Sequence, residues 1–348
     1  MITITYRRIL ISTFAVFLAG FFLMLFSNNV ISAEKKSAFQ VWLNQVKMEA
    51  LAKGIKPNVV KKLLSNVSPN RRVIKRDRNQ TEFKLTLSVY LNRVVTSQNV
   101  LIGKRKAVKH ADLLQSVSKK FGVQPRFILA VWGIETRFGA VNANVPLISA
   151  VATLAYDARR SNFFRKQLFA VLEMVDKGYA GSENLFGSWA GAMGQPQFMP
   201  TSYLAYARDF DGDGRRDIWN NEADVFASIA NYLASHGWDA TQTWGRKVLV
   251  PGILWEKLGR PSRRVARGCR AKVSQRKLLS EWNKLGVKKI DGEKLPSRRI
   301  KASLVLPDGQ KGADYYLVYK NYASIMSYNC AHLYAVTVGT LADQIGRQ

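Results

Sequence analysis

Apolar side chains recur at helical spacing along most of the first 240 residues, and this pattern limits the chain to folds built mainly from helices. Short polar or glycine-containing turns separate the segments that carry this spacing. The predicted helices are Phe39–Leu51, Pro57–Leu64, Phe83–Val95, Ala111–Phe121, Pro125–Phe138, Ser149–Ala155, Phe163–Asp176 and Val225–Ser235. Residues 71–78 (RRVIKRDR) interrupt the pattern as a polar, basic stretch. Because 47% of the residues are apolar, the chain can bury a substantial core.

The pattern changes after Gly237. Short β-like pieces, such as Lys247–Val250 and Ser303–Leu306, alternate with glycine and proline, and from Tyr315 to Ile345 a strand-like piece precedes a long apolar-striped helix. We therefore expect a mainly α protein with a small α+β insertion. The expected division is a leader at 1–33, an N-terminal helical subdomain at 34–103, a helical core at 104–238, a mixed subdomain at 239–312 and a helix returning to the core at 313–348.

Glu135 lies on the apolar stripe of the helix that begins at Pro125, three residues after Trp132 and three before Phe138. A carboxylate is costly to desolvate in such a place. Either a distant cation pairs with it, or its pKa is raised for a purpose. A raised pKa would keep the side chain protonated near neutral pH, as a general acid requires.

Residues 187–202 (GSWAGAMGQPQFMPTS) cannot form a regular helix, because three glycines and two prolines interrupt them. Polar side chains such as Ser188 and Gln197 stand beside aromatic ones such as Trp189 and Phe198. This mixture suits a saccharide, which offers hydroxyl groups at its edges and C–H faces for stacking. An ordinary surface loop is the alternative.

Residues 209–220 (DFDGDGRRDIWN) have the spacing of a calcium-binding EF-hand loop, with acids at relative positions 1, 3, 5 and 9 and glycine at 6. Position 12 is Asn220 instead of glutamate, so Glu222 or Asp224 would close the ligand shell in a longer loop. The predicted ligands are Asp209, Asp211, Asp213, the carbonyl of Arg215, Asp217 and Asp224. We expect a structural Ca²⁺ and no cofactor for catalysis; a self-capped turn with arginine neighbours is the alternative.

The first 33 residues have the layout of a secretory signal. Arg7 and Arg8 precede an uncharged run of 18 residues, and small residues ending at Ala33 suit a cleavage site. The run is also just long enough to span a bilayer, so a cleaved signal and an uncleaved inner-membrane anchor are both open. Either leaves the bulk of the chain in the periplasm.

The chain carries 53 Lys+Arg against 24 Asp+Glu, a net charge of +29, which indicates an anionic partner. Export favours an anionic envelope surface over nucleic acid, and we expect a monomer. Cys269 and Cys330 are the only cysteines, and in an oxidising compartment they predict a disulfide; two buried free thiols are the alternative. The three histidines lack the spacing of zinc ligands.

Five segments together resemble the lytic murein transglycosylases of the B type, glycoside hydrolase family 103. They are GIETRFG around Glu135, GSWAGAMGQPQFMPTSY, DFDGDGRRDIW, SIANYLASHGW and YNCAHLYAV, in matching order from about Gln40 to Ile345. The resemblance implies a lysozyme-like helical core with added α and β subdomains. It also implies cleavage of the β-1,4 bond between N-acetylmuramic acid and N-acetylglucosamine in peptidoglycan strands, with 1,6-anhydromuramyl ends as product.

The same resemblance implies that Glu135 is the single catalytic acid and base. The residues that it places along the glycan-binding groove are Ser188, Gln197, Phe198, Tyr232, Tyr328, Asn329 and Tyr334, with Arg160 meeting a peptide or acetamido group. Ala331 stands where a serine is expected, and Cys330 lies beside the groove residues. A hydrolytic muramidase and a non-catalytic cell-wall-binding protein are the alternative functions.

Overall fold

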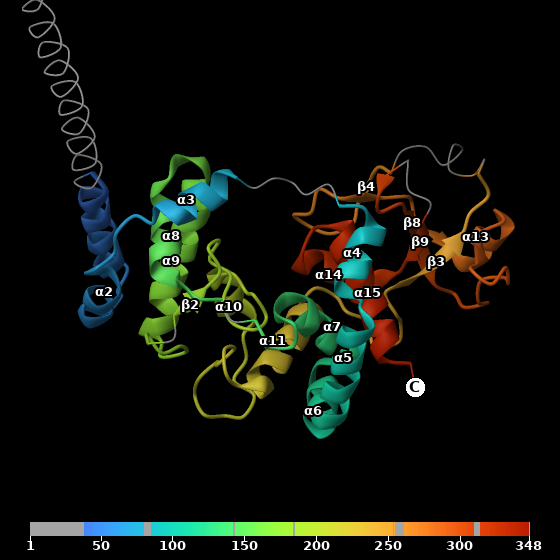
Figure 1. Ribbon diagram of the computed structural model, residues 1–348, viewed down its shortest axis with the longest axis horizontal. Helices are drawn as coiled ribbons and strands as arrows, with labels where there is room; N and C mark the ends of the chain where they lie inside the picture. Colours follow the sequence, from blue (N-terminus) through green and yellow to red (C-terminus); the bar gives the residue numbers. More distant parts are fainter. Residues whose placement is uncertain are drawn as a thin grey trace, which may run out of the picture.

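The computed structural model describes residues 38–79, 85–141, 143–183, 185–252, 254, 261–309 and 314–347. Figure 1 shows one group of helices around α8 and α9, a second around α7 and α15, and α10 and α11 between them. Residues 38–52 are also helical. The labelled helices are α2 (Pro57–Leu64), α3 (Arg71–Arg78), α4 (Leu87–Val94), α5 (Ser97–Lys109), α6 (Ala111–Phe121), α7 (Pro125–Thr136), α8 (Leu147–Tyr156), α9 (Ser161–Asp176), α10 (Pro200–Tyr206), α11 (Glu222–Ser235), α13 (Leu279–Lys284), α14 (Lys320–Tyr328) and α15 (His332–Ile345).

The first group buries the apolar faces of residues 38–52, α2 and α3 against α8 and α9. The basic stretch 71–78, which has no helical pattern in sequence, is the helix α3. The side chain of Asn70 caps it by accepting hydrogen bonds from the amides of Arg72 and Val73. Val73 and Asp77 are its only buried residues, so this helix is held by a short buried face and by its N-cap and not by a long apolar stripe.

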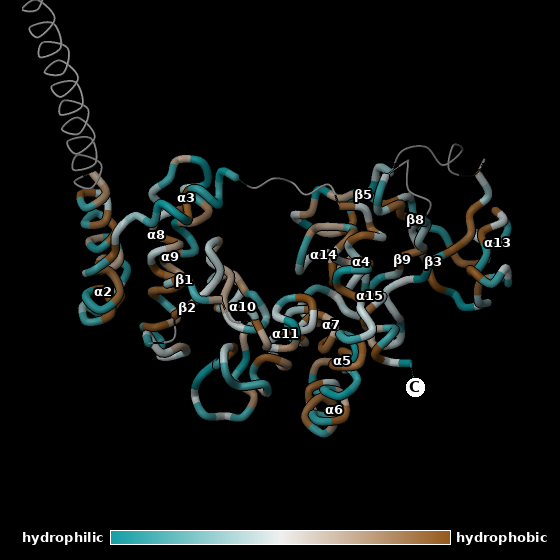
Figure 2. Tube along the Cα trace, in the orientation of Figure 1, coloured by the Kyte–Doolittle hydropathy of each residue, from teal (hydrophilic) through white to brown (hydrophobic). Residues whose placement is uncertain are grey.

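The second group surrounds α7, which α5, α6, α11 and α15 contact. Figure 2 shows hydrophobic colour on these helices where they face one another. Because α4 and α5 pack on α15 and α7, they belong with this group and not with residues 38–79. The expected limit between residues 103 and 104 falls inside α5, and the division into subdomains remains a prediction.

A five-stranded antiparallel sheet in the order β6-β8-β9-β3-β7 forms the mixed part of the fold. Its strands are β3 (Gly245–Leu249), β6 (Lys277–Leu278), β7 (Lys288–Lys289), β8 (Lys301–Val305) and β9 (Tyr315–Val318). Trp282 of α13 is fully buried in a small apolar cluster with the sheet. The expected α+β insertion is therefore confirmed, and β9, which lies beyond residue 312, completes its sheet.

Two-stranded ribbons accompany this sheet: β1 (Val145–Pro146) pairs with β2 (Phe186–Gly187), and β4 (Arg263–Arg264) pairs with β5 (Lys272–Val273). The long C-terminal helix expected up to Ile345 is two helices, α14 and α15. Extended backbone at Asn329 and Ala331 separates them, and Cys330 lies in this break.

Candidate active site

Glu135 lies in the last turn of α7. The helix starts at Pro125, whose missing N–H costs nothing at that position, and every residue from Phe127 to Gly133 is buried. The chain then leaves the helix through two residues in the left-handed region, Arg137 (φ 51°) and Phe138 (φ 58°). The ring of Phe138 folds back so closely that a Cβ on Gly133 would lie 2.6 Å from its Cζ. A larger residue at position 133 would therefore require the ring of Phe138 to shift.

Tyrosines surround the carboxyl group of Glu135. The hydroxyl of Tyr334 donates a 2.6 Å hydrogen bond to its Oε1, and the charge of Glu135 acts on Tyr90 and Tyr328. Trp132, which shares the sequence stripe with Glu135, packs edge to face on Phe138 with ring centroids 5.7 Å apart. The partners of the acid thus come from α4, α14 and α15 as well as from its own helix.

Burial raises the pKa of Glu135 to about 7, and the hydrogen bond from Tyr334 opposes this rise because it favours the charged form. Within the described part of the chain, no lysine, arginine or histidine forms an ion pair with Glu135. Of the two interpretations of this glutamate in sequence, the geometry favours a perturbed acid over a paired one.

Four rings from three separate segments form a cluster that we call the aromatic wall: Phe198, Tyr232, Tyr328 and Tyr334. The centroid of Phe198 lies 5.6 Å from that of Tyr232 and 5.8 Å from that of Tyr328. Tyr328 in turn stacks at 6.4 Å on Tyr334, the residue that binds the acid. Their hydroxyls also brace the fold, since Tyr328 donates to the carbonyl of Pro196 and Tyr232 to that of Ser327. The structure therefore brings these four predicted residues together beside Glu135.

The loop at residues 187–202 attaches to α7 through Gln195. Its side chain accepts from the indole N–H of Trp132 (2.6 Å) and donates to the carbonyl of Trp219 (2.8 Å). Its carbonyl accepts from the hydroxyl of Thr136, the neighbour of Glu135. Ser188 and Gln197 form hydrogen bonds within the loop, to the amide of Ala192 and the carbonyl of Gly194. The amides of this loop thus fix its shape relative to the acid.

Two other predicted residues lie in different surroundings. Asn329 is exposed in the break between α14 and α15. Arg160 binds the buried carboxylate of Asp77, which Arg159 also holds through a 2.8 Å bond from its Nε. Burial alone would raise the pKa of Asp77, but the hydrogen bonds from the two arginines outweigh it and lower the pKa. Among the described residues, no hydrogen bond, ion pair or ring contact links Arg160 to the aromatic wall.

Carboxylate oxygens of Asp209, Asp211 and Asp213 lie within 4.8 Å of one another. This arrangement suits a hard cation such as Ca²⁺, which prefers oxygen ligands. The acids of this loop also accept backbone amide hydrogen bonds, as in a self-capped turn: Asp209 from Gly212 and Gly214, Asp211 from Asp213, Asp213 from Arg215, Asp217 from Trp219 and Asn220, and Asp224 from Phe210 and Asp217. Burial raises the pKa of Asp224 to about 6. Three of the six predicted ligands therefore converge, and the other positions remain predictions.

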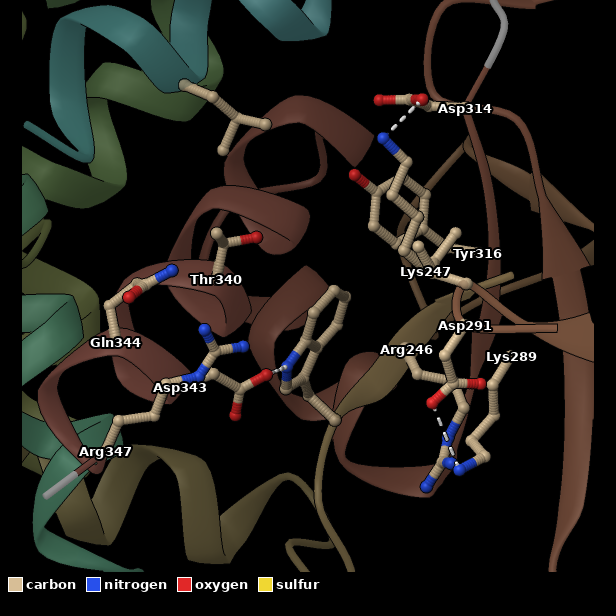
Figure 3. A pocket seen from close by; sticks show the side chains of 13 residues that line it. Arg246, Lys247, Lys289, Asp291, Asp314, Tyr316, Thr340, Asp343, Gln344 and Arg347 are labelled. Carbon is tan, nitrogen blue, oxygen red and sulfur yellow. Dashed lines mark hydrogen bonds and ion pairs between the residues drawn. The ribbon is translucent and has the colours of Figure 1, made fainter. Parts of the chain in front are cut away.

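A cleft of about 630 Å³ lies away from these residues, between α15 and the sheet (Figure 3). Its charged side chains are largely paired with one another, Lys247 with Asp314 at 2.6 Å and Lys289 with Asp291 at 3.3 Å. Asp343 pairs with Arg126, outside the lining. Neither Glu135 nor any residue of the aromatic wall lines it, so its size does not make it the candidate active site.

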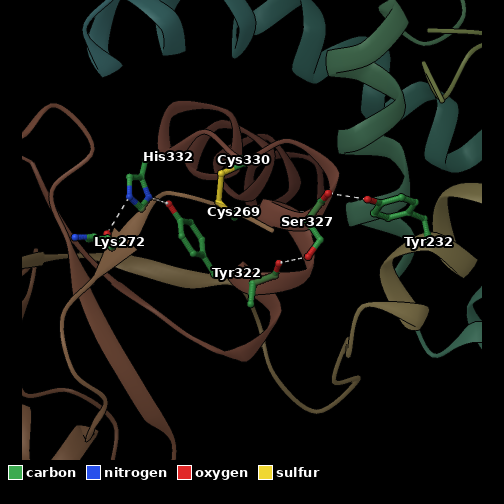
Figure 4. The surroundings of a disulfide bond; sticks show 8 residues. Tyr232, Cys269, Lys272, Tyr322, Ser327, Cys330 and His332 are labelled. Carbon is green, nitrogen blue, oxygen red and sulfur yellow. Dashed lines mark hydrogen bonds between the residues drawn. A yellow bond between two sulfur atoms is a disulfide. The ribbon is translucent and has the colours of Figure 1, made fainter. Parts of the chain in front are cut away.

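A disulfide joins Cys269 to Cys330, with Cα atoms 5.4 Å apart (Figure 4). The ring of His332 bridges the same two segments, since its Nε2 lies 3.1 Å from the carbonyl oxygen of Lys272 and its Nδ1 2.8 Å from the hydroxyl of Tyr322. The break that follows Tyr328 is thus fastened to the β4–β5 ribbon.

Residues 38–343 match the family described as the transglycosylase SLT domain. The chain belongs to this family. The match spans all the segments described above, including α7, the loop at 187–202 and the aromatic wall.

Three relatives of this transglycosylase chain are informative. The membrane-bound lytic murein transglycosylase B of Escherichia coli is 32% identical over 74% of this chain and 66% of its own length. SltB3 from Pseudomonas aeruginosa, solved with NAG-anhNAM-pentapeptide, aligns with a TM-score of 0.81 and 38% identity over 88% of this chain and 79% of that one. Escherichia coli Slt35, solved with calcium, aligns with a TM-score of 0.72 and 28% identity over 87% and 92%.

These alignments confirm the expected fold class, a lysozyme-like helical core with an additional N-terminal helical part and a small α+β insertion. The expected signal or anchor at residues 1–33 lies outside the described residues. Among the helices that the structure describes, none combines the length and apolar character needed to cross a membrane.

Proposed function

We propose that this protein is a peptidoglycan lytic transglycosylase that cuts the β-1,4 bond between N-acetylmuramic acid and N-acetylglucosamine and leaves 1,6-anhydromuramyl ends. The observation that carries the proposal is the state of Glu135, a carboxyl group with a pKa near 7 that Tyr334 holds against the aromatic wall. Among the described residues, the causes of the raised pKa of Glu135 are burial and the bond from Tyr334, and no second carboxyl group is among them. An enzyme with a single acid at the site can use a nucleophile that the substrate itself supplies.

In the proposed mechanism, Glu135 first donates its proton to the glycosidic oxygen, and the bond from that oxygen to the muramyl C1 breaks. The muramyl 2-acetamido group or the dipoles of the site stabilise the positive charge at C1. Glu135, now a carboxylate, removes the proton from the muramyl C6 hydroxyl, whose oxygen bonds to C1. The proton returns to Glu135 and no water is consumed, so one residue acts as acid and then as base. A pKa near the working pH serves both steps.

We assign the glycan-binding role to the aromatic wall and to the loop at 187–202. Tyr328, the least buried of the four rings, offers its face to the sugar C–H surfaces, and Phe198, Tyr232 and Tyr334, which are largely buried, form the wall behind it. Ser188, Gln197 and Asn329 offer polar groups to the hydroxyl and acetamido groups of the sugar. For Arg160, the contact with a peptide or acetamido group of the substrate remains a prediction from the sequence. Tyr90, which no motif in the sequence indicates, joins this set, because burial and the nearby charge of Glu135 raise its pKa.

The experiment that tests this function is the mass of the product released from purified peptidoglycan. Anhydro ends are lighter by one water than the reducing ends that a hydrolytic muramidase would leave. Glu135→Gln should abolish digestion and keep binding to the sacculus, since the amide is nearly isosteric but cannot donate and accept the proton. Reducing ends from the wild-type protein would favour the muramidase, and absence of any digestion would favour a non-catalytic binding protein.

We also propose that the loop at 209–224 holds a structural Ca²⁺, with the carboxylates of Asp209, Asp211 and Asp213 as ligands. The convergence of these oxygens supports it, and the solved relative Slt35 was crystallised with calcium. The ion would hold the segment between α10 and α11. The ion takes no part in the proposed reaction.

The partner that fits this function is the peptidoglycan strand, in the periplasm. SltB3 of Pseudomonas aeruginosa was solved with NAG-NAM-pentapeptide, a fragment of that kind. A net charge of +29 attracts the chain to an anionic envelope surface, with a range of about 8 Å at physiological ionic strength. We propose that the protein acts there as a monomer.

A further inference from the structure

Positive charge is distributed unevenly along the chain. Residues 239–312 contain 19 Lys+Arg and 6 Asp+Glu, a net charge of +13, whereas the core segment 104–238 contains 16 and 12, a net charge of +4. Within the first segment, residues 257–280 hold nine cations and no acid. The charge is therefore not spread evenly as a general aid to solubility.

Part of this acid-free segment forms the β4–β5 ribbon, and we call residues 261–277 the basic hairpin. Arg264 of β4 lies directly opposite Lys272 of β5, a placement that like charges disfavour. Burial and the nearby charge of Arg276 lower the pKa of Arg263, whose Nε is buried without a hydrogen-bond partner. Within the described ranges, no ion pair involves any cation of the hairpin. A group of mutually repelling, unneutralised cations is suited to bind an anion.

The basic hairpin is held rigidly. Val265, Cys269 and Val273 are buried in the same hydrophobic cluster as α7 and α15. Five cations of the hairpin are exposed: Arg264 and Lys272 in the ribbon, and Arg267, Arg270 and Arg276 outside its paired residues. The disulfide from Cys269 and the bridge through His332 fasten it to the break after α14 (Figure 4). Its position relative to the aromatic wall is therefore fixed by a covalent bond and by the core.

The distance from the hairpin to the wall is short. The Cα atoms of Cys269 and Cys330 are 5.4 Å apart, and each step along the chain adds at most 3.8 Å, so the Cα atoms of Arg270 and Tyr328 lie within about 17 Å. An extended pentapeptide spans up to about 17 Å as well. A peptide attached to a sugar at the wall can thus place its carboxylates on the basic hairpin.

We propose that the basic hairpin is a second substrate contact, which binds the carboxylates of the peptide stems on a glycan strand held at the aromatic wall. This inference rests on the proposed function and names a feature of the substrate: strands that keep their stems are the preferred form. The uncharged sugar ring reaches the aromatic residues, and the stem carboxylates reach the arginines. An anionic lipid surface is the competing partner for the same charges.

The test uses the full chain with Arg264, Arg267 and Arg270 changed to Gln. A matched control changes Lys284, Lys288 and Lys294 to Gln, which removes the same charge from exposed positions around α13, at the opposite end of this part of the molecule from α14 (Figure 1). The substrates are soluble glycan strands with intact stems and the same strands after enzymatic removal of the stems. Each variant is compared with wild type by KM, kcat and thermal midpoint.

We expect the hairpin variant to raise KM for stem-bearing strands by about tenfold, since three exposed ion pairs are lost, with kcat and the thermal midpoint unchanged. KM for stem-free strands should stay the same, and the control should remain within about twofold of wild type for both. The salt dependence of KM for stem-bearing strands should also weaken in the hairpin variant alone.

Three results would overturn the proposal. Equal losses in the hairpin variant and the control would mean that only the net charge matters. An equal loss on stem-free strands would exclude the stems as the ligand. An unchanged KM combined with lost binding to phosphatidylglycerol vesicles would assign the hairpin to a lipid surface. Wild type that releases no anhydro ends from either substrate would refute the proposed function itself, which keeps the two failures distinct.

Discussion

The hydrogen bond between Tyr334 and Glu135 gives the sharpest test of the acid–base assignment. Because the Tyr334 hydroxyl donates to the carboxylate, it stabilises the charged form and lowers the pKa, while burial raises it to about 7 in total. Tyr334→Phe removes only the opposing contribution. The pKa of Glu135 should therefore rise further.

The size of the rise follows from the bond. A hydrogen bond to a charged group contributes about 1.5–3 kcal/mol, and one pKa unit corresponds to about 1.4 kcal/mol. We expect the pKa to rise by roughly one unit or somewhat more. Since the first step needs protonated Glu135, the alkaline limb of kcat/KM should move from about pH 7 to about pH 8, even though the maximal rate falls when the acid loses its orientation.

The assay is the pH profile of kcat/KM, measured as anhydro ends released from soluble strands. Tyr232→Phe is the matched control, because its hydroxyl donates to the carbonyl of Ser327 and not to Glu135. We expect that variant to change the rate through sugar binding alone, so its alkaline limb should keep the wild-type position. An alkaline limb that stays in place or moves downward in Tyr334→Phe would refute the assignment of Glu135 as the titrating acid.

Three further predictions follow from the same geometry. Glu135→Gln should stabilise the protein by roughly 3 kcal/mol at pH 8 and by little at pH 4.5. The reason is that the folded wild-type protein, in which the pKa of Glu135 is raised, loses stability as the pH rises from 4.5 through 7. Urea unfolding at both pH values measures this difference. Ca²⁺ should raise the thermal midpoint of wild type but not of Asp209→Asn, as calorimetry with and without chelator would show. Gly133→Ala should cost about 1–3 kcal/mol, because its Cβ meets the ring of Phe138; a neutral effect in urea unfolding would contradict that packing.

Much of the helical fold could be predicted because its stripes are local. The predicted segments Pro57–Leu64 and Ala111–Phe121 coincide with α2 and α6. The helices α3 and α5 lacked a prediction because each buries few residues, and in α5 only Gly103 is fully buried. The N-caps at Asn70 and Thr96 stabilise these two helices, together with tertiary contacts that the spacing of apolar residues does not predict.

The candidate site was predictable only in part. Glu135 attracted attention because it breaks an apolar stripe, a local signal. Tyr90 gave none, since a tyrosine in a short amphipathic helix is ordinary until the fold brings it near the acid. Gln195 is one of two glutamines in the loop, and nothing local marks its bond to Trp132, which joins positions 63 residues apart.

The chemistry of Glu135 is therefore a property of the whole fold. An isolated α7 would leave this side chain in water with an ordinary pKa, because desolvation requires neighbours and its bonded partner stands 199 residues away. That partner arrives on α15, after a break in the chain that the disulfide at Cys330 fastens to the basic hairpin. The helices α14 and α15 thus supply two rings of the aromatic wall, orient Glu135 and connect to the cations of the basic hairpin.

Val265 and Val273 of the basic hairpin lie in one hydrophobic cluster with α7 and α15. The aromatic wall and the basic hairpin therefore belong to a single rigid body. On the proposed function and the proposed hairpin contact, binding at either place would order the substrate relative to Glu135 without a movement of the protein.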